Sequence, residues 1–173
     1  MNEWSVYTIG HSNVEAGSVV DLLRQNAIQL VVDVRSVPYS QYTPWFNKEV
    51  WQRTLAEANI GYRFAGEYLG GRPSEAQYYR RGEVPEGKTN YLKHVDYEQL
   101  AQDEKYLQGI GALIKLARSA PTAIMCSEED PDRCHRHHLI AQTLLQRGVS
   151  VWHIRGDGAR EAAMPKPKQE RLF

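Results

Sequence analysis

Short apolar runs alternate along the chain with longer segments in which apolar residues recur every three or four positions. The first kind of segment is typical of buried strands and the second of amphipathic helices. Strands are predicted at residues 4–9, 28–34, 61–65, 122–126 and 149–154. Helices are predicted after Ser12, at 47–59, at 97–118 and from Asp130 to about 148. This alternation predicts one α/β domain, with a mostly parallel sheet of about five strands and helices on both faces.

Polar residues mark the expected helix starts. Ser12 and Glu15 have the spacing of a capping box, and Asn47 stands where it can cap the second helix. Asp130 is followed by Pro131, a pair that suits the cap and first position of a helix.

Residues 67–96 interrupt the alternation with a polar stretch that is rich in glycine and proline. We interpret it as a long irregular insertion, and long loops of this kind are often functional. The α/β domain is expected to span residues 1–160, and residues 161–173 to form a flexible basic tail.

Composition narrows the functional classes. The 173 residues carry a formal net charge of zero, so no global field recruits nucleic acid or an anionic membrane. No apolar run approaches the roughly 20 residues that cross a bilayer, and the N-terminus lacks the pattern of a signal peptide. With only two cysteines, the chain is expected to be cytoplasmic.

The polar residues that could carry chemistry follow the predicted strands. Because parallel strands end at one edge of a sheet, these residues are expected to gather there, where open α/β sheets bind ligands. We predict acid/base or catalytic roles for Asp33, Glu128 and His11. We predict ligand contacts for Arg35, Ser36, Cys126, Arg136 and Tyr39, the tyrosine as a surface that could stack a base.

Four motifs occur in a fixed order: Thr8-Ile9-Gly10-His11-Ser12, Asp33-Val34-Arg35-Ser36, Leu69-Gly70-Gly71, and Cys126-x-Glu128 with Cys134-His135-Arg136. Together they resemble the domain-of-unknown-function family 488, from Tyr7 to about Gly156. The resemblance implies a compact α/β domain with a site at the sheet edge, and it implies no particular reaction.

The segment from Cys126 to Arg136 leaves two further chemistries open. A catalytic thiol at Cys126 is disfavoured by four carboxylates in its loop, and Arg133 lies one residue too far for a C-x5-R phosphatase loop. Metal binding is suggested by the density of ligands: Cys126, Cys134, His135, His137 and His138. The C-x7-C-H spacing matches no common structural zinc motif, so no metal is assigned and the cofactor stays unknown.

The last five residues resemble the peptide that binds the bacterial sliding clamp. Gln169, Leu172 and Phe173 match that peptide, whereas Glu170 and Arg171 differ from it. Such motifs function on exposed termini, and nearby lysines would favour DNA.

The leading hypothesis is therefore an enzyme-like domain whose polar pocket acts on a nucleotide, a nucleobase or damaged nucleic acid. In it, Asp33 and Glu128 serve as acid/base groups, and His11, Arg35 and Arg136 hold an anion. The alternatives are a non-catalytic adaptor of DNA metabolism that binds the sliding clamp, and a thiol- or metal-binding domain. The sequence does not decide whether the domain is catalytic.

Overall fold

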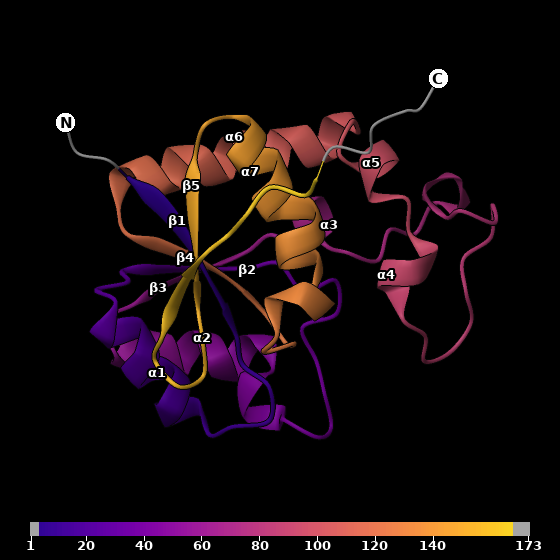
Figure 1. Cartoon of the computed structure of the whole chain (residues 1–173). Coiled ribbons are helices and arrows are strands. Elements are labelled where there is room, and N and C mark those ends of the chain that lie inside the picture. The colour runs from indigo at the N-terminus through magenta and orange to yellow at the C-terminus, as the bar shows by residue number, and fades with distance from the viewer. Residues whose placement is uncertain (1–3, 168–173) are drawn as a thin grey trace.

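A six-stranded sheet lies between two layers of helices in the computed structural model, which describes residues 4–167 (Figure 1). The strand order is β3-β2-β4-β1-β5-β6, and the first five strands of this order are parallel. The strands are β1 (Ser5–Gly10), β2 (Leu30–Asp33), β3 (Gly61–Phe64), β4 (Thr122–Cys126), β5 (Ser150–Ile154) and β6 (Arg160–Ala162). The predicted α/β fold and mostly parallel sheet are confirmed.

The sixth strand was not predicted. β6 runs antiparallel to β5, and all three of its residues are exposed, so no apolar pattern marks it in the sequence. Ala163 after it is buried and donates its backbone N–H to Val151 at 2.8 Å. The ordered domain therefore continues past residue 160, into the first residues of the predicted tail.

Helices cover both faces of the sheet. On one face lie α1 (Ala16–Gln25) and α2 (Lys48–Glu57). On the other lie α3 (Gly66–Leu69), α6 (Glu104–Ser119) and α7 (Gln142–Gln146), the last preceded by a π-helical turn at Arg136–Ala141. No helix within residues 4–167 is both long and apolar enough to span a membrane.

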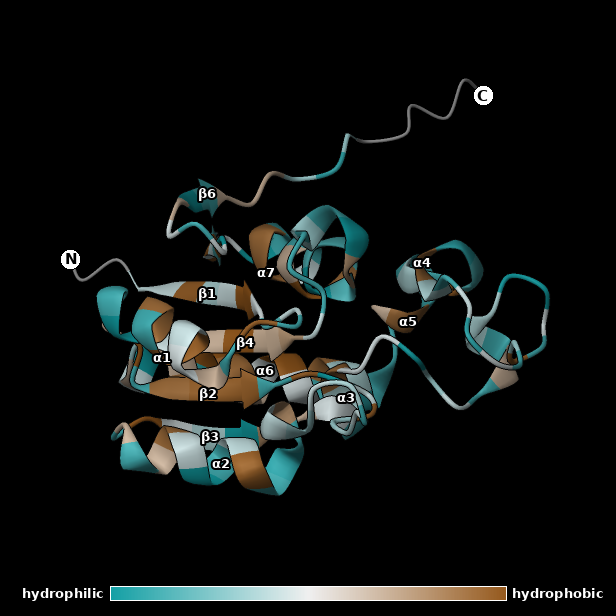
Figure 2. Cartoon of the chain, turned by 90° about the horizontal axis from the view of Figure 1, so that it is seen from below, coloured by the Kyte–Doolittle hydropathy of each residue, from teal (hydrophilic) through white to brown (hydrophobic). Residues whose placement is uncertain are grey.

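The strands face the two helical layers with alternate residues. Val31 and Met125 pack toward α1 and α2, whereas Val32 and Ile124 pack toward α6 and α7. All four side chains are essentially buried, and each such burial contributes about 1.5–3 kcal/mol. Figure 2 shows the central strands β2 and β4 largely in the brown of hydrophobic residues. The central strands β2 and β4 are therefore largely apolar on both faces, and the polar side chains of Asp33 and Cys126 stand at their ends.

The predicted capping box does not form. The backbone N–H of Ser12 donates to Ser127 at 2.8 Å, which extends the β1–β4 pairing, and Ser12 takes a left-handed φ of 48°. Helix α1 starts four residues later, and Glu15 makes no side-chain cap. Asn47 precedes α2 without capping it, because its Oδ1 accepts from the Ser40 backbone.

The insertion is mostly irregular but contains short helical segments. It contains a 3₁₀ turn at Ala76–Tyr78 and α4 (Tyr91–His94), and it leads into α5 (Tyr97–Leu100). The predicted helix at 97–118 is divided into α5 and α6, because Asp103 accepts from the Tyr106 backbone and starts a new helix. α4 and the neighbouring insertion project from the body of the domain (Figures 1 and 2).

Asp130 does cap a helical turn, but a short one. Its carboxylate accepts from the Asp132 backbone and begins a 3₁₀ turn at Pro131–Arg133. That turn places Cys134 and His135 directly before the π-helical turn, at the carboxyl edge of β4. The loop after β4 thus folds back toward the strand end from which it leaves.

Candidate functional site

A cavity of about 740 Å³ opens at the carboxyl ends of β2 and β4, bounded on its far side by the insertion. Residues that directly follow the two strands form one wall, among them Arg35, Ser36, Cys126 and Glu128. Residues 71–72 and 88–93, together with Tyr97, form the opposite wall. Four of the eight residues predicted for chemistry or ligand contact thus line one cavity.

Arg35 is fixed on three sides at the edge of this cavity. Its Nε and Nη2 donate to the Asp33 carboxylate at 2.9 and 2.7 Å, and Nη2 also donates to the Phe46 carbonyl at 2.8 Å. Its Nη1 donates to His11 Nε2 at 3.2 Å. Four of the five guanidinium N–H groups are thereby engaged, and one N–H of Nη1 has no partner among residues 4–167. Arg35 therefore keeps one oriented donor for a ligand.

The Asp33 carboxylate is placed to hold Arg35 in position. Its carboxylate is completely buried and does not line the cavity. Both oxygens are occupied, one by the backbone N–H and Nε of Arg35 and the other by Nη2 and the Tyr62 hydroxyl. The sequence places Asp33 at the strand end but gives no sign that its side chain turns inward.

His11 also has a positioning role. Its Nδ1 lies 2.6 Å from the Ser12 carbonyl, which can only accept, so Nδ1 holds the proton and Nε2 accepts from Arg35. Burial and then the Arg35 guanidinium lower the pKa of His11 to about 4. The ring stacks on Phe46 with centroids 4.2 Å apart. A neutral, buried imidazole in this setting holds Arg35 and does not reach a ligand.

Other predicted residues are divided between the cavity and the rest of the surface. Glu128 lines the cavity, and its carboxylate has no hydrogen-bond partner among the described residues. Ser36 lines it too, where its hydroxyl accepts from the Arg72 backbone at 3.0 Å. Tyr39 is about half exposed, donates to Glu49 at 2.8 Å and does not line the cavity. The predicted ligand contact of Tyr39 is not supported.

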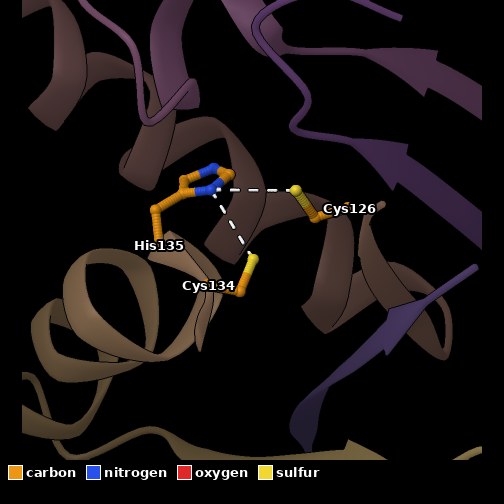
Figure 3. A group of neighbouring side chains, drawn as sticks. All are labelled: Cys126, Cys134 and His135. Atoms are coloured by element: carbon orange, nitrogen blue, oxygen red, sulfur yellow. Dashed lines mark hydrogen bonds between the residues drawn. The ribbon is translucent and has the colours of Figure 1, made fainter. Parts of the chain in front are cut away.

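Cys126, Cys134 and His135, here called the Cys–Cys–His cluster, converge at the cavity wall (Figure 3). His135 Nδ1 lies 3.8 Å from Cys126 Sγ and 3.7 Å from Cys134 Sγ. The other ring nitrogen, Nε2, lies 3.1 Å from the carbonyls of both Val34 and Leu69. Nε2 therefore carries the proton, and Nδ1 presents its lone pair to the two sulfurs.

Two glycines allow this close assembly. A Cβ at Gly71 would lie 2.5 Å from His135 Cγ, and a Cβ at Gly10 would lie 1.8 Å from the Glu128 carbonyl oxygen. The insertion backbone can thus lie against the imidazole, and the loop after β4 can cross the end of β1.

Arg136 lies beneath the cluster and is fully buried, so it does not line the cavity as predicted. Its backbone N–H and its Nε donate to Cys134 Sγ at 3.5 and 3.4 Å. Its Nη2 donates to the Glu128 and Glu129 carbonyls at 2.6 and 3.0 Å. Within residues 4–167, no carboxylate lies within 4.0 Å of the guanidinium. The buried cation therefore has the sulfur of Cys134 as its nearest potential anion.

The pKa values of the two thiols are shifted in opposite directions. Burial favours the neutral thiol of Cys134, but its hydrogen bond with Cys126 and the Arg136 guanidinium outweigh burial and lower its pKa. The same hydrogen bond and burial raise the pKa of Cys126. Of the two thiols, Cys134 is therefore the one that is deprotonated more readily.

A hydrogen-bond chain leads from Arg136 toward the surface. Arg136 Nη1 donates to the Thr8 hydroxyl at 3.2 Å, and that hydroxyl donates to His153 Nδ1 at 2.7 Å. His153 Nε2 then donates to His137 Nδ1 at 3.1 Å. Burial and then Arg136 lower the pKa of His153 to about 3, so this imidazole stays neutral.

A model of the protein family described as "Domain of unknown function DUF488" matches residues 15–143. The match includes the motifs around Asp33, Gly71 and Cys126. The chain belongs to the DUF488 family. Comparisons with curated proteins and with solved structures found no match.

The cavity of this DUF488 domain has a positive charge balance that the sequence did not reveal. Five cationic side chains line it against two carboxylates, Glu128 and Asp132. The cations are Arg35, Arg72, Lys88, Lys93 and Arg133. Three of these come from the insertion, which has no periodicity to indicate which way its side chains point. The glycine-rich, polar composition of the insertion was the one signal in the sequence that this segment could be functional.

The predicted clamp-binding residues of this DUF488 domain, Gln169, Leu172 and Phe173, lie outside the described residues.

Proposed function

We propose that this DUF488 domain binds a phosphate-bearing small molecule, with a nucleotide as the best fit, in the cavity at the sheet edge. The observation that carries the proposal is Arg35, whose guanidinium is fixed by Asp33, His11 and Phe46 and keeps one donor free at the cavity wall. A guanidinium held in advance loses little freedom when it binds an oxyanion.

The charge of the cavity supports an anionic ligand. Five cations face two carboxylates, although the whole chain has a formal net charge of zero. Charge of one sign collected in a concave site attracts small ligands of the opposite sign. Long nucleic acid would suit an extended basic face. Here the cations line a cavity, so a small ligand is the better fit.

Aromatic side chains in the insertion wall support the nucleotide in particular. Tyr91 and Tyr97 line the cavity, and the Arg72 guanidinium lies 4.5 Å from the centroid of the Tyr91 ring. Aromatic rings and arginine planes both stack on nucleobases. This wall takes the stacking role that the sequence had suggested for Tyr39.

Glu128 is the residue we assign to proton transfer at the bound ligand. Its carboxylate lines the cavity, and no group among residues 4–167 hydrogen bonds to it. It is thus available to a ligand, unlike the carboxylate of Asp33. Any proton transfer that the domain performs on its ligand would rest on this residue.

Calorimetric titration with AMP, ADP, ATP, inorganic phosphate, adenosine and a short single-stranded oligonucleotide tests the proposal. We expect the nucleotides to bind, and adenosine to bind at least about tenfold more weakly, because it lacks the charge that Arg35 recognises. Equal binding of adenosine and AMP, or no binding of any phosphate-bearing probe at millimolar concentration, would refute it.

A pair of arginine variants locates the ligand. Arg72→Ala removes a cavity cation and should weaken nucleotide binding about tenfold or more, since a hydrogen bond to a charged group contributes about 1.5–3 kcal/mol. Arg24→Ala is the matched control, because Arg24 is exposed on α1 and does not line the cavity. Equal affinities of the two variants would place the ligand elsewhere.

The adaptor alternative depends on Gln169, Leu172 and Phe173 and stays a prediction. Recovery of the sliding clamp by the full chain, compared with a chain that ends at Lys168, tests it directly.

A further inference from the structure

We infer that Cys126, Cys134 and His135 form a binding site for a thiolate-preferring divalent cation, zinc above all, with one coordination position open to the cavity. The inference is independent of the proposed nucleotide, because it rests on three side chains and can be tested with the metal alone.

The distances suit tetrahedral zinc. The three ligand atoms lie within 4.8 Å of one another, and Nδ1 is 3.8 and 3.7 Å from the two sulfurs. With Zn–S bonds of about 2.3 Å and a Zn–N bond of about 2.0–2.1 Å, a tetrahedral site has S···N distances of about 3.6 Å. Movements of a few tenths of an ångström would therefore bring both S···N distances to the tetrahedral value.

The imidazole is prepared as a ligand. Its Nε2 proton is held between the carbonyls of Val34 and Leu69, each at 3.1 Å, so the neutral imidazole presents the Nδ1 lone pair to the sulfurs. Histidines that bind metals are commonly oriented in this way, by donating their other ring N–H to a carbonyl or carboxylate. Gly71, whose backbone lies against the ring, prevents it from turning away.

Arg136 stabilises a thiolate at Cys134, which is the second requirement for metal binding after an oriented imidazole. The guanidinium is fully buried, has no carboxylate within 4.0 Å in the described part of the chain, and donates to Cys134 Sγ through Nε. A buried cation needs a compensating anion. Two neutral thiols would leave Arg136 with only neutral acceptors in direct contact within the described part of the chain, whereas a metal-bound thiolate gives it an anionic one.

The donor set decides which cation is bound. Two sulfurs and one imidazole favour zinc and other soft or borderline metals over magnesium or calcium, which prefer oxygen. All three ligands line the cavity, so the fourth position faces it. Three protein ligands and an open position are typical of catalytic zinc sites, whereas structural sites have four.

The sequence spacing gave no indication of this site because the loop after β4 folds back on itself. The 3₁₀ turn at Pro131–Arg133 returns the chain to the strand end, so Cys134 and His135 meet Cys126 across the turn. Common zinc motifs place two ligands on one tight turn, but here the strand end supplies one ligand and the turn the other two.

The test uses the full chain purified without chelator, with no nucleotide present. Elemental analysis should find about one zinc per chain. After chelation under reducing conditions, titration with Co²⁺ should give an intense sulfur-to-cobalt charge-transfer band and the visible bands of tetrahedral coordination. Absence of both zinc and the charge-transfer band would overturn the inference.

Variants assign the ligands. Cys126→Ser and His135→Ala should each weaken metal binding at least about 100-fold, whereas His94→Ala, outside the cluster, should leave it unchanged. Cys126→Ser is the decisive variant because it leaves the pairing of Arg136 with Cys134 intact, so a folded protein is expected. Circular dichroism checks this. A folded Cys126→Ser variant with wild-type cobalt affinity would contradict the assignment.

Discussion

Replacing Asp33 with asparagine tests whether this carboxylate positions Arg35 or takes part in chemistry. The Asp33 side chain is completely buried, and each of its oxygens accepts two hydrogen bonds. Oδ1 accepts from the backbone N–H and Nε of Arg35. Oδ2 accepts from Arg35 Nη2 and from the Tyr62 hydroxyl. An asparagine amide, in either orientation, therefore points its NH₂ group at an arginine donor.

The expected cost follows from the burial of both partners. Arg35 is 5% exposed, so losing the charge of Asp33 leaves a buried cation without its anion, which costs about 3–5 kcal/mol. For a domain of this length the melting temperature should fall by about 6–20 °C, at about 2–4 °C per kcal/mol. Tyr62→Phe, which removes one bond to the carboxylate but keeps the ion pair, should cost less, about 1.5–3 kcal/mol.

Urea unfolding followed by tryptophan fluorescence measures these differences. Asp21→Asn on the exposed side of α1 is the matched control. If the stability of Asp33→Asn lies within about 0.5 kcal/mol of this control, the positioning role is refuted. A catalytic role would instead predict near-normal stability with loss of turnover.

Three further predictions concern pH and packing. His11 and His153 have pKa values of about 4 and 3, below the ordinary 6.5, so the unfolded chain takes up protons first. The free energy of unfolding should therefore fall as pH drops below 6.5, by up to about 1.4 kcal/mol per pH unit for each histidine. Urea titrations of His153→Gln should show a shallower slope, and an unchanged slope contradicts the assignment. The pKa of Glu129 is lowered to about 2 by its hydrogen bond to an arginine, so Glu129→Gln should cost about 0.5–1 kcal/mol at pH 7 and progressively less as pH falls from 4.5 toward 2. Unfolding curves at both ends of that range check this, and a difference that does not change with pH argues against it. Gly71→Ala should cost about 1–3 kcal/mol and weaken cobalt binding, because the new methyl group displaces the cluster imidazole. Its control, Gly111→Ala, meets open space on α6 and should stabilise by about 0.5–1 kcal/mol, so equal melting temperatures of the two variants would count against the packing argument.

The order of strands and helices was enough to predict the sheet and the edge at which the cavity lies. Arg35, Ser36, Cys126 and Glu128 follow β2 and β4, and parallel topology brings such positions together whatever the side chains do. The direction of each side chain could not be predicted from this order. Asp33 turns into the protein because Arg35 and Tyr62 offer it donors there, which depends on a contact between β2 and β3.

Two other parts of the site depended on irregular backbone. Arg136 begins a π-helical turn that directs it beneath the cluster, and no apolar periodicity predicts such a turn. The cations of the insertion, Arg72 and Lys88 among them, lie in segments without regular structure. The basic character of the cavity therefore became visible only with the fold.

The central place of β1 in the sheet has a consequence for the order in which the protein can be assembled. Among residues 4–167, β1 pairs only with β4 and β5, which begin more than 110 residues later in the chain. As the chain is synthesised, β1 has no strand partner until β4 is made. Until then, β2 and β3 can pair only with each other. Contacts so distant in sequence form slowly, and unpaired strand edges are prone to aggregation. Thr8, which bonds Arg136, cannot meet it until the loop after β4 has emerged, so the cluster is among the last parts of the molecule to form. Chains stalled before Thr122 should therefore depend most on chaperones, and pulse proteolysis of stalled nascent chains would detect this as protection that appears only once β4 has been made.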